Sequence, residues 1–290
     1  MHDGMVTTAN TGVELHYRDW GGYGPPLVLV HGLASTLRIW DFVAPVLAEK
    51  YRVVAYDQRG HALSGKPGDG YDLTTMLADL VGLLEALHIE KPVVVGHSWG
   101  ANLALAYAAA YPYACSALVL VDGGVYDFQD TPGTTWEGVR RDLAPPDLSA
   151  FKLTDMVSRM HRGALSHLPV SFLEEYARSM MDVQPDGTIR ARLTRDRHLD
   201  ILHIIYSMRS ADLLSKVKCP ILAIQAVDGE PADSRGADFL RRKKQGVERV
   251  ERLVHGAGII WMEDTIHDIP LQRPERLANE ITAFLAVKGL

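Results

Sequence analysis

Cysteine is scarce in this sequence, since its 290 residues include only Cys115 and Cys219. Each lies beside an apolar segment typical of a buried strand, so we predict two core thiols rather than a disulfide framework. Long apolar runs are also missing, because no window reaches the roughly 18 residues that a membrane-spanning helix needs. The first residues show no basic stretch followed by an apolar one, so we expect no secretory leader and a cytoplasmic protein.

The motifs of metal, nucleotide and nucleic-acid binding are missing as well. The sequence has 12 histidines, yet it contains no His-Glu-x-x-His pair and no Cys-x-x-Cys. No Gly-x-Gly-x-x-Gly loop leads from a strand into a helix. The formal net charge is −6, and the short basic run Arg241–Lys244 is typical of one solvated helix face. We therefore expect no cofactor, no metal, and neither a nucleic-acid nor a membrane partner.

What the sequence does contain is an alternation of short apolar runs with longer helical patterns, which is typical of parallel βα units in one sheet. Unbroken apolar runs favour strands that helices cover on both faces, whereas residues 13–20 alternate like a half-exposed antiparallel strand. We predict an α/β fold with a mostly parallel central sheet flanked by helices. The expected strands are residues 13–20, 27–30, 53–56, 92–95, 117–121, 220–224 and 259–262, and the expected helices are 38–49, 73–88, 100–111 and 274–285.

This rhythm stops between about residues 127 and 212, which lack a long apolar strand and are rich in helical patterns. We predict a core made of residues 1–126 and 213–290, with residues 127–212 inserted into it. The turn signals 144–147 and 184–187 predict several short helices there. Trp136, Met156 and Met160 are our candidates for substrate contacts, because flexible methionines and aromatic rings suit apolar ligands.

The strongest chemical signal is Gly96-His97-Ser98-Trp99-Gly100, which follows an apolar strand and precedes a helical stretch. Gly-x-Ser-x-Gly between a strand and a helix is the pattern of a nucleophile elbow, in which a sharp turn exposes a serine hydroxyl above the sheet. We predict Ser98 as a nucleophile. An oxyanion hole needs two backbone amides, and the amides of Trp99 and of Leu33, in the loop after strand 27–30, are the candidates.

A serine nucleophile needs a general base and an acid that orients it. We predict His267 as the base, because it follows the strand-like residues 259–262, whereas the competing His255 precedes them. For the acid we favour Asp228, which follows strand 221–226 in the chain order Ser, Asp, His. Asp122, at the end of strand 117–121, stays open as the alternative. The remaining candidates for the acid are two further carboxylates, Glu230 and Asp233.

Four motifs in this order resemble the α/β-hydrolase superfamily. They are the elbow, His31-Gly32, the run Asp57-Gln58-Arg59-Gly60-His61-Ala62-Leu63-Ser64, and His267-Asp268-Ile269-Pro270 followed by Arg273-Pro274-Glu275. The resemblance implies an α/β-hydrolase fold, in which the inserted residues 127–212 form a helical cap over the pocket. Asp228 stands one residue out of the family's usual register, which keeps Asp122 open as the acid.

The resemblance also implies the class of reaction. Family members that cleave epoxides or haloalkanes use aspartate at the elbow, so Ser98 disfavours both. We expect a serine hydrolase acting on a carboxylic ester or lactone, a small-molecule substrate of medium or bulky apolar character, through an acyl-enzyme. A carbon–carbon bond hydrolase or a perhydrolase of the same fold is the alternative enzyme, and a ligand receptor that retains the triad is the alternative outside catalysis.

Overall fold

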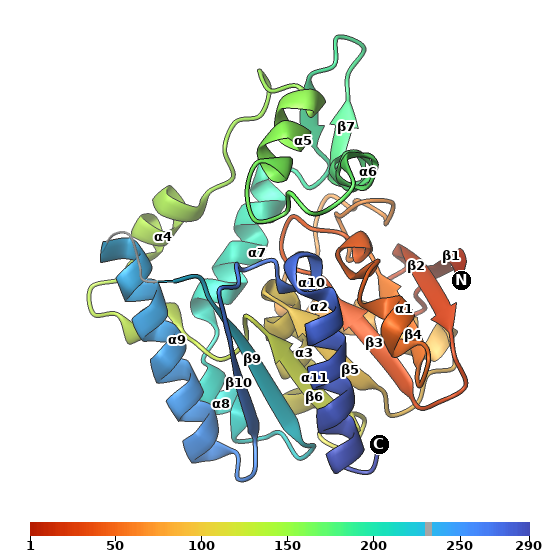
Figure 1. The fold of residues 1–290 in the computed structure, drawn as a ribbon, viewed down its shortest axis with the longest axis vertical. Coiled ribbons are helices and arrows are strands. Elements are labelled where there is room, and N and C mark those ends of the chain that lie inside the picture. Colours follow the sequence, from red (N-terminus) through yellow and green to blue (C-terminus); the bar gives the residue numbers. More distant parts are fainter. Residues whose placement is uncertain (230–233) are drawn as a thin grey trace.

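A mostly parallel sheet forms the centre of the computed structural model, which describes residues 1–229 and 234–290 (Figure 1). Within these residues the sheet has eight strands in the order β1-β2-β4-β3-β5-β6-β9-β10. β1 and β2 are antiparallel to their neighbours, and the strands from β4 to β10 run parallel. The predicted fold class is thereby confirmed. The strands are β1 (His2–Thr7), β2 (Glu14–Gly21), β3 (Pro26–Val30), β4 (Arg52–Tyr56), β5 (Val93–His97), β6 (Ala117–Val121), β9 (Ile221–Val227) and β10 (Gly258–Glu263).

Helices cover both faces of the sheet, so the parallel strands are buried on each side. Successive strand residues point to opposite faces, and Val28 and Leu27 accordingly belong to separate apolar clusters. One cluster includes residues of α2, α3, α8 and α9, and the other includes residues of α1, α10 and α11. These helices are α1 (Ala44–Leu47), α2 (Leu73–Ala86), α3 (Trp99–Ala110), α8 (Ser210–Leu214), α9 (Ser234–Leu253), α10 (Ile269–Gln272) and α11 (Pro274–Val287).

Two local differences from the predicted elements have simple causes. The helix predicted over 38–49 is a 3₁₀ turn, η1 (Leu37–Trp40), followed by the short α1. Pro45 lies in the first turn of α1, and proline cannot continue a helix that arrives from before it. β1 was not predicted, because it lies at the sheet edge and most of its side chains are exposed.

Residues 127–212, which were predicted to be an insertion, form mainly helices, and Figure 1 shows them above the sheet. The turn at 184–187 was expected to separate two helices, but it joins the two strands of a hairpin, and Gly187 adopts a φ of 82° there. α8 spans the predicted boundary at residue 212. The elements are η2 (Phe128–Asp130), α4 (Trp136–Leu143), α5 (Leu153–His161), α6 (Val170–Met180), β7 (Met181–Val183), β8 (Ile189–Ala191) and α7 (Arg195–Ser207).

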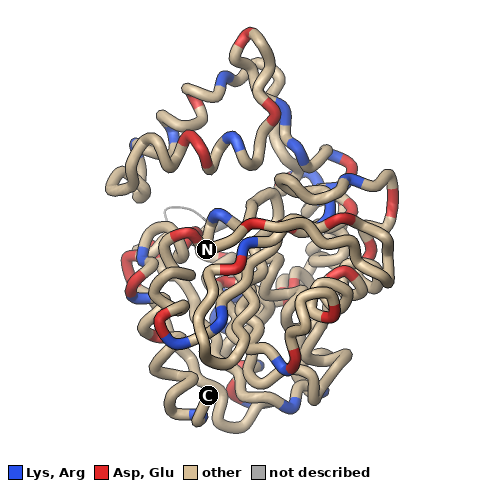
Figure 2. The backbone as a smooth tube through the Cα atoms, turned by 90° about the vertical axis from the view of Figure 1, so that its right-hand side faces the viewer, with Lys and Arg blue, Asp and Glu red and all other residues tan. Residues whose placement is uncertain are grey.

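The distribution of charged residues and the state of the two cysteines agree with what the sequence indicates. Figure 2 shows Lys and Arg interspersed with Asp and Glu along the chain. Cys115 and Cys219 are both free and buried, as predicted. In the part of the chain that the structure describes, no helix has the length and apolar character needed to cross a membrane.

Candidate active site

Ser98 occupies a sharp turn between β5 and α3, with a φ of 55° and a ψ of −122°. A residue with a side chain seldom adopts a positive φ, and such strain persists only where the surrounding structure imposes it. Here the Ser98 amide donates to the Val121 carbonyl at 2.9 Å. Gly100 is needed because a Cβ atom there would lie 2.2 Å from the Val30 carbonyl oxygen. The turn therefore has the strand-turn-helix geometry expected of a nucleophile elbow.

Two backbone amides beside Ser98 are available to bind an oxyanion. Leu33 and Trp99 line the same cavity as Ser98. Among residues 1–229 and 234–290 neither amide has a hydrogen-bond acceptor; that of Trp99 lies in the first turn of α3, where amides have no partner within the helix. The Trp99 indole donates to Gln58 Oε1 at 2.8 Å, and Gln58 Nε2 donates to the His31 carbonyl at 2.6 Å. Gln58 thus connects the two segments that carry the amides.

His31 and His61 fix the loop that carries Leu33 through hydrogen bonds of their ring nitrogens. His31 Nε2 accepts from the Gln58 amide at 3.0 Å, and His61 Nε2 accepts from the Ala34 amide at 3.2 Å. Both rings are buried, and burial lowers the pKa of each. Since a ring nitrogen can accept only when unprotonated, these neutral histidines position the loop and are not suited to carry protons.

His267 lies in the loop after β10 and pairs with Asp122 at the end of β6. His267 Nδ1 donates to Asp122 Oδ2 at 2.6 Å, which leaves Nε2 available on the other side of the ring. The His267 side chain is 45% exposed and lines the cavity that also contains Ser98. His255, the competing candidate, is exposed and precedes β10.

The favoured prediction for the orienting acid, Asp228, is wrong in this geometry, and the alternative Asp122 contacts the imidazole. In the parallel pairing of β6 with β9, Val121 lies opposite Ile224. β9 therefore runs three residues beyond that level, and Asp228 emerges exposed past its end. Two further alternatives, Glu230 and Asp233, lie outside the described residues.

Asp122 is completely buried, and both of its carboxylate oxygens accept hydrogen bonds. Oδ1 accepts from the Ala226 amide at 2.9 Å and from Lys243 Nζ at 2.6 Å, while Oδ2 faces His267. Burial raises the pKa of Asp122, but the hydrogen bond from His267 and the charges of His267 and Lys243 outweigh it and bring the pKa down to about 2. The Asp122 carboxylate is therefore ionised in the folded protein at neutral pH.

Lys243 is the participant that the sequence analysis missed. It belongs to the basic run that was predicted to be a solvated helix face, yet only 5% of the residue is exposed. Its ammonium group also donates to the Ala226 carbonyl at 2.9 Å and lies 4.9 Å from the centroid of the Phe239 ring. A lysine spaced one helical turn from an aromatic residue on the same helix face was the signal that could have indicated an inward orientation.

His97, next to the nucleophile, anchors the segment that carries His267. Its Nε2 donates to the His267 carbonyl at 2.8 Å, and its ring lies 4.8 Å from the His267 ring. Burial, together with the charge of the neighbouring His267, lowers the pKa of His97 to about 4. Burial also opposes charge on His267, but the hydrogen bond and charge of Asp122 outweigh it, so the pKa of His267 is raised.

The cavity above Ser98 has a volume of about 1070 Å³. Its walls come from the core and from the inserted segment, which contributes Phe128, Val139 and Leu202. A hydroxyl, an imidazole held by a buried carboxylate, and two free amides facing one cavity can together carry out acyl transfer. In the described residues no group of three or more His, Cys, Asp or Glu side chains is arranged to hold a metal ion.

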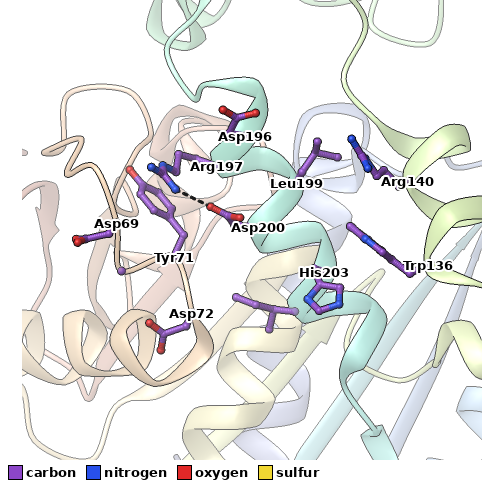
Figure 3. A pocket seen from close by; sticks show the side chains of 12 residues that line it. Asp69, Tyr71, Asp72, Trp136, Arg140, Asp196, Arg197, Leu199, Asp200 and His203 are labelled. Carbon is purple, nitrogen blue, oxygen red and sulfur yellow. Dashed lines mark hydrogen bonds and ion pairs between the residues drawn. The ribbon is translucent and has the colours of Figure 1, made fainter.

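The three predicted substrate contacts are not among the residues that line this cavity. Trp136 lies in a second pocket of about 670 Å³, where its ring packs 4.7 Å from His203 of α7 (Figure 3). Met156 and Met160 on α5 are half-buried against the apolar cluster of the inserted segment and core. The structure does not bring these three side chains to the Ser98 cavity, because composition indicates apolar character but not which helix face meets the cavity.

With the fold and site described, comparison with known proteins establishes the family. The sequence model of the alpha/beta hydrolase fold matches residues 25–257, so the chain belongs to the α/β-hydrolase family, as the motifs implied.

Curated relatives match over part of the chain. A non-heme chloroperoxidase of Streptomyces lividans is 40% identical over 121 residues, which are 41% of this chain and 44% of that protein. Epoxide hydrolase 1 of Caenorhabditis elegans is 38% identical over 110 residues, or 37% of this chain and 27% of the relative. A bifunctional esterase/perhydrolase of Acinetobacter calcoaceticus is 38% identical over 111 residues, or 38% and 40%. The matched region thus spans less than half of each relative.

Solved structures match over nearly the whole chain. E-2-(acetamidomethylene)succinate hydrolase has a TM-score of 0.76 at 21% identity, covering 98% of this chain and 100% of the other. The thioesterase domain from a curacin biosynthetic pathway has a TM-score of 0.75 at 20% identity, with 98% and 99% covered. At these identities the likeness shows a shared fold.

Proposed function

We propose that the protein is a serine hydrolase that cleaves a carboxylic ester or lactone through an acyl-enzyme, with Ser98, His267 and Asp122 as its catalytic triad. The observation that carries this proposal is the 2.6 Å contact between His267 Nδ1 and Asp122 Oδ2, at the cavity where Ser98 and two free amides lie. Because Nδ1 donates to the carboxylate, Nε2 is the nitrogen that accepts the serine proton.

The reaction follows from these roles. Ser98 Oγ attacks the carbonyl carbon while His267 Nε2 takes its proton, and the amides of Leu33 and Trp99 bind the oxyanion. Collapse of the tetrahedral intermediate breaks the bond to the alkoxide, which takes the proton from His267. Water then attacks the acyl-enzyme with His267 again as base, releasing the acid and restoring Ser98. Asp122 stays ionised throughout and stabilises the imidazolium.

Two considerations support ester cleavage within the family. A serine at the elbow is the nucleophile of its esterases and lactonases, whereas its epoxide hydrolases use aspartate, so the relative of that name is not a guide here. The relative from Acinetobacter calcoaceticus is named as an esterase as well as a perhydrolase. We further propose that residues 127–212 act as a cap, since Phe128, Val139 and Leu202 line the cavity.

Perhydrolysis is a second candidate, because two relatives are named as a chloroperoxidase and an esterase/perhydrolase. In that reaction hydrogen peroxide replaces water in the attack on the acyl-enzyme and releases a peracid. The same serine, histidine and amides serve both reactions, so the ratio of peracid to acid formed at a fixed peroxide concentration separates them.

Stopped-flow hydrolysis of p-nitrophenyl esters of increasing acyl length tests the proposal. We expect a burst of p-nitrophenol equal to the enzyme concentration, because acylation precedes a slower release of the acid. Ser98→Ala removes the nucleophile and is expected to reduce kcat by at least about 10³-fold with unchanged circular dichroism. Retention of the parent rate in Ser98→Ala would sink the proposed mechanism.

A further inference from the structure

Arg242 is a cation of the Ser98 cavity that has no carboxylate partner among residues 1–229 and 234–290. It is half-buried on α9 and lines the cavity together with Ser98 and His267. Its Nε donates to Thr131 Oγ1 at 2.7 Å. The centre of the guanidinium lies 5.6 Å from the centroid of the Phe128 ring. The side chain is thus held from two sides, while its two terminal nitrogens donate to no acceptor of the described residues.

Three other cations of α9 are paired with carboxylates. Arg241 contacts Asp238 at 3.0 Å, Lys243 contacts Asp122 at 2.6 Å, and Arg249 contacts Asp130 at 2.5 Å. Partial burial without a counter-ion disfavours a charged group, because lost hydration is not replaced. Lys244 also lacks a counter-ion among the described residues, but it is exposed to water, whereas Arg242 is partly buried, so a bound anion would stabilise its charge.

The other charged side chains that line the cavity are less suited to bind an anion. Arg141 contacts Asp142 at 3.0 Å, and Asp238 is engaged by Arg241. Glu137 is exposed, so water screens its charge. Arg242 remains as the group with a preset orientation and free donors.

The charge and planar shape of the Arg242 guanidinium indicate which kind of ligand it can bind. Its planar fork matches the two oxygens of a carboxylate, and anchoring the Nε side leaves the two terminal nitrogens for such a pair. Phe128 beneath the group limits its rotation, so less conformational freedom is lost when the ligand binds.

We propose that Arg242 binds a carboxylate of the substrate, so that the ester or lactone cleaved at Ser98 carries a second, anionic group. This rests on the proposed function for the identity of the scissile bond, but the anion site itself does not require turnover. Thr131 and Phe128 position the arginine, and the distance from Arg242 to the acylated serine sets the length of the preferred acyl chain.

A binding experiment tests the anion site without catalysis. The full chain carrying Ser98→Ala is titrated calorimetrically with succinate, glutarate and adipate, and with the corresponding neutral diamides. We expect at least one dicarboxylate to bind more tightly than its diamide. Adding Arg242→Gln is expected to raise its Kd about 10- to 100-fold, the usual cost of losing a charged hydrogen-bonded pair, and Arg242→Lys to raise it less.

Arg241→Gln is the matched control, because this adjacent arginine pairs with Asp238 at the surface and is expected to leave the Kd within about twofold. Equal affinity for dicarboxylates and diamides would overturn the proposal, as would an equal loss in the Arg241 and Arg242 variants. Thermal melts show whether each variant remains folded under the conditions of the titration.

A kinetic comparison separates this proposal from the proposed function. The parent and Arg242→Gln proteins are assayed with p-nitrophenyl hexanoate and with the mono-p-nitrophenyl ester of adipic acid, which has a terminal carboxylate. We expect Arg242→Gln to lower kcat/KM about 10- to 100-fold for the carboxylate ester and less than about threefold for the neutral one. Absence of turnover with retained dicarboxylate binding contradicts the ester chemistry alone, and turnover without this discrimination contradicts the role of Arg242 alone.

Discussion

Replacing Lys243 by methionine tests how a buried cation sets the pH range of the reaction. Lys243 Nζ and His267 Nδ1 each lie 2.6 Å from a different oxygen of Asp122, which places the two nitrogens about 6 Å apart across one carboxylate. At an effective dielectric constant of about 20, two unit charges at that separation repel by about 3 kcal/mol. Because the His267 side chain is 45% exposed, we expect screening to reduce this to about 1 kcal/mol.

The sign follows from the charges around the ring. Asp122 and Asp268 favour protonated His267, whereas Lys243 and burial disfavour it. Removing Lys243 therefore raises the pKa of His267, so the base stays protonated and inactive to a higher pH. We expect the acid limb of the kcat/KM profile to move to higher pH. A repulsion of about 1 kcal/mol corresponds to a fall of about fivefold in kcat/KM at pH values below the midpoint of the acid limb. This fall is measured relative to kcat/KM on the alkaline plateau.

The assay is kcat/KM for one p-nitrophenyl ester from acid to mildly alkaline pH, with Lys243→Arg as the control that keeps the charge. The shape of the profile is the readout, because a purely structural effect of Lys243→Met lowers the rate at every pH by the same factor. A folded Lys243→Met protein whose acid limb stays in place, or moves to lower pH, would refute the electrostatic reasoning.

Four other substitutions test the remaining geometry. Asp122→Asn should lower kcat about 10³- to 10⁴-fold through loss of the oriented imidazole, whereas Asp228→Asn should change it less than about threefold; the reverse order would restore the acid predicted from sequence. His97→Ala removes the hydrogen bond to the His267 carbonyl and should lower kcat about 10-fold with little change in KM, so a pure KM effect contradicts the anchoring role. Gly123→Ala places a Cβ atom 2.3 Å from the carbonyl oxygen of the nucleophile and should destabilise the fold by about 1–3 kcal/mol in chemical denaturation, which an unchanged midpoint would contradict.

Features that depend on local sequence could be predicted. The parallel strands are unbroken apolar runs, and the elbow is a motif whose glycines and neighbours are adjacent in the chain. His267 could be placed because it follows the last strand directly. None of these predictions required knowing how far one strand extends past another.

The acid and the substrate contacts could not be predicted because they depend on register and on helix orientation. Asp122 and Asp228 both follow strands, and only the relative lengths of β6 and β9 decide which reaches His267. Lys243 and Arg242 looked like a solvated pair, but α9 packs so that one is buried against Asp122 and the other lines the cavity. Trp136 was predicted from its apolar aromatic ring, and that character does not determine which way the side chain points.

The position of Asp122 directly after β6 has a consequence for how the protein can change. Asp122 is followed by Gly123 and Gly124, and the inserted segment begins a few residues later. Under the proposed function, a graft that replaces residues 127–212 begins next to the acid of the triad, so we expect it to preserve activity only when residues 122–126 are kept.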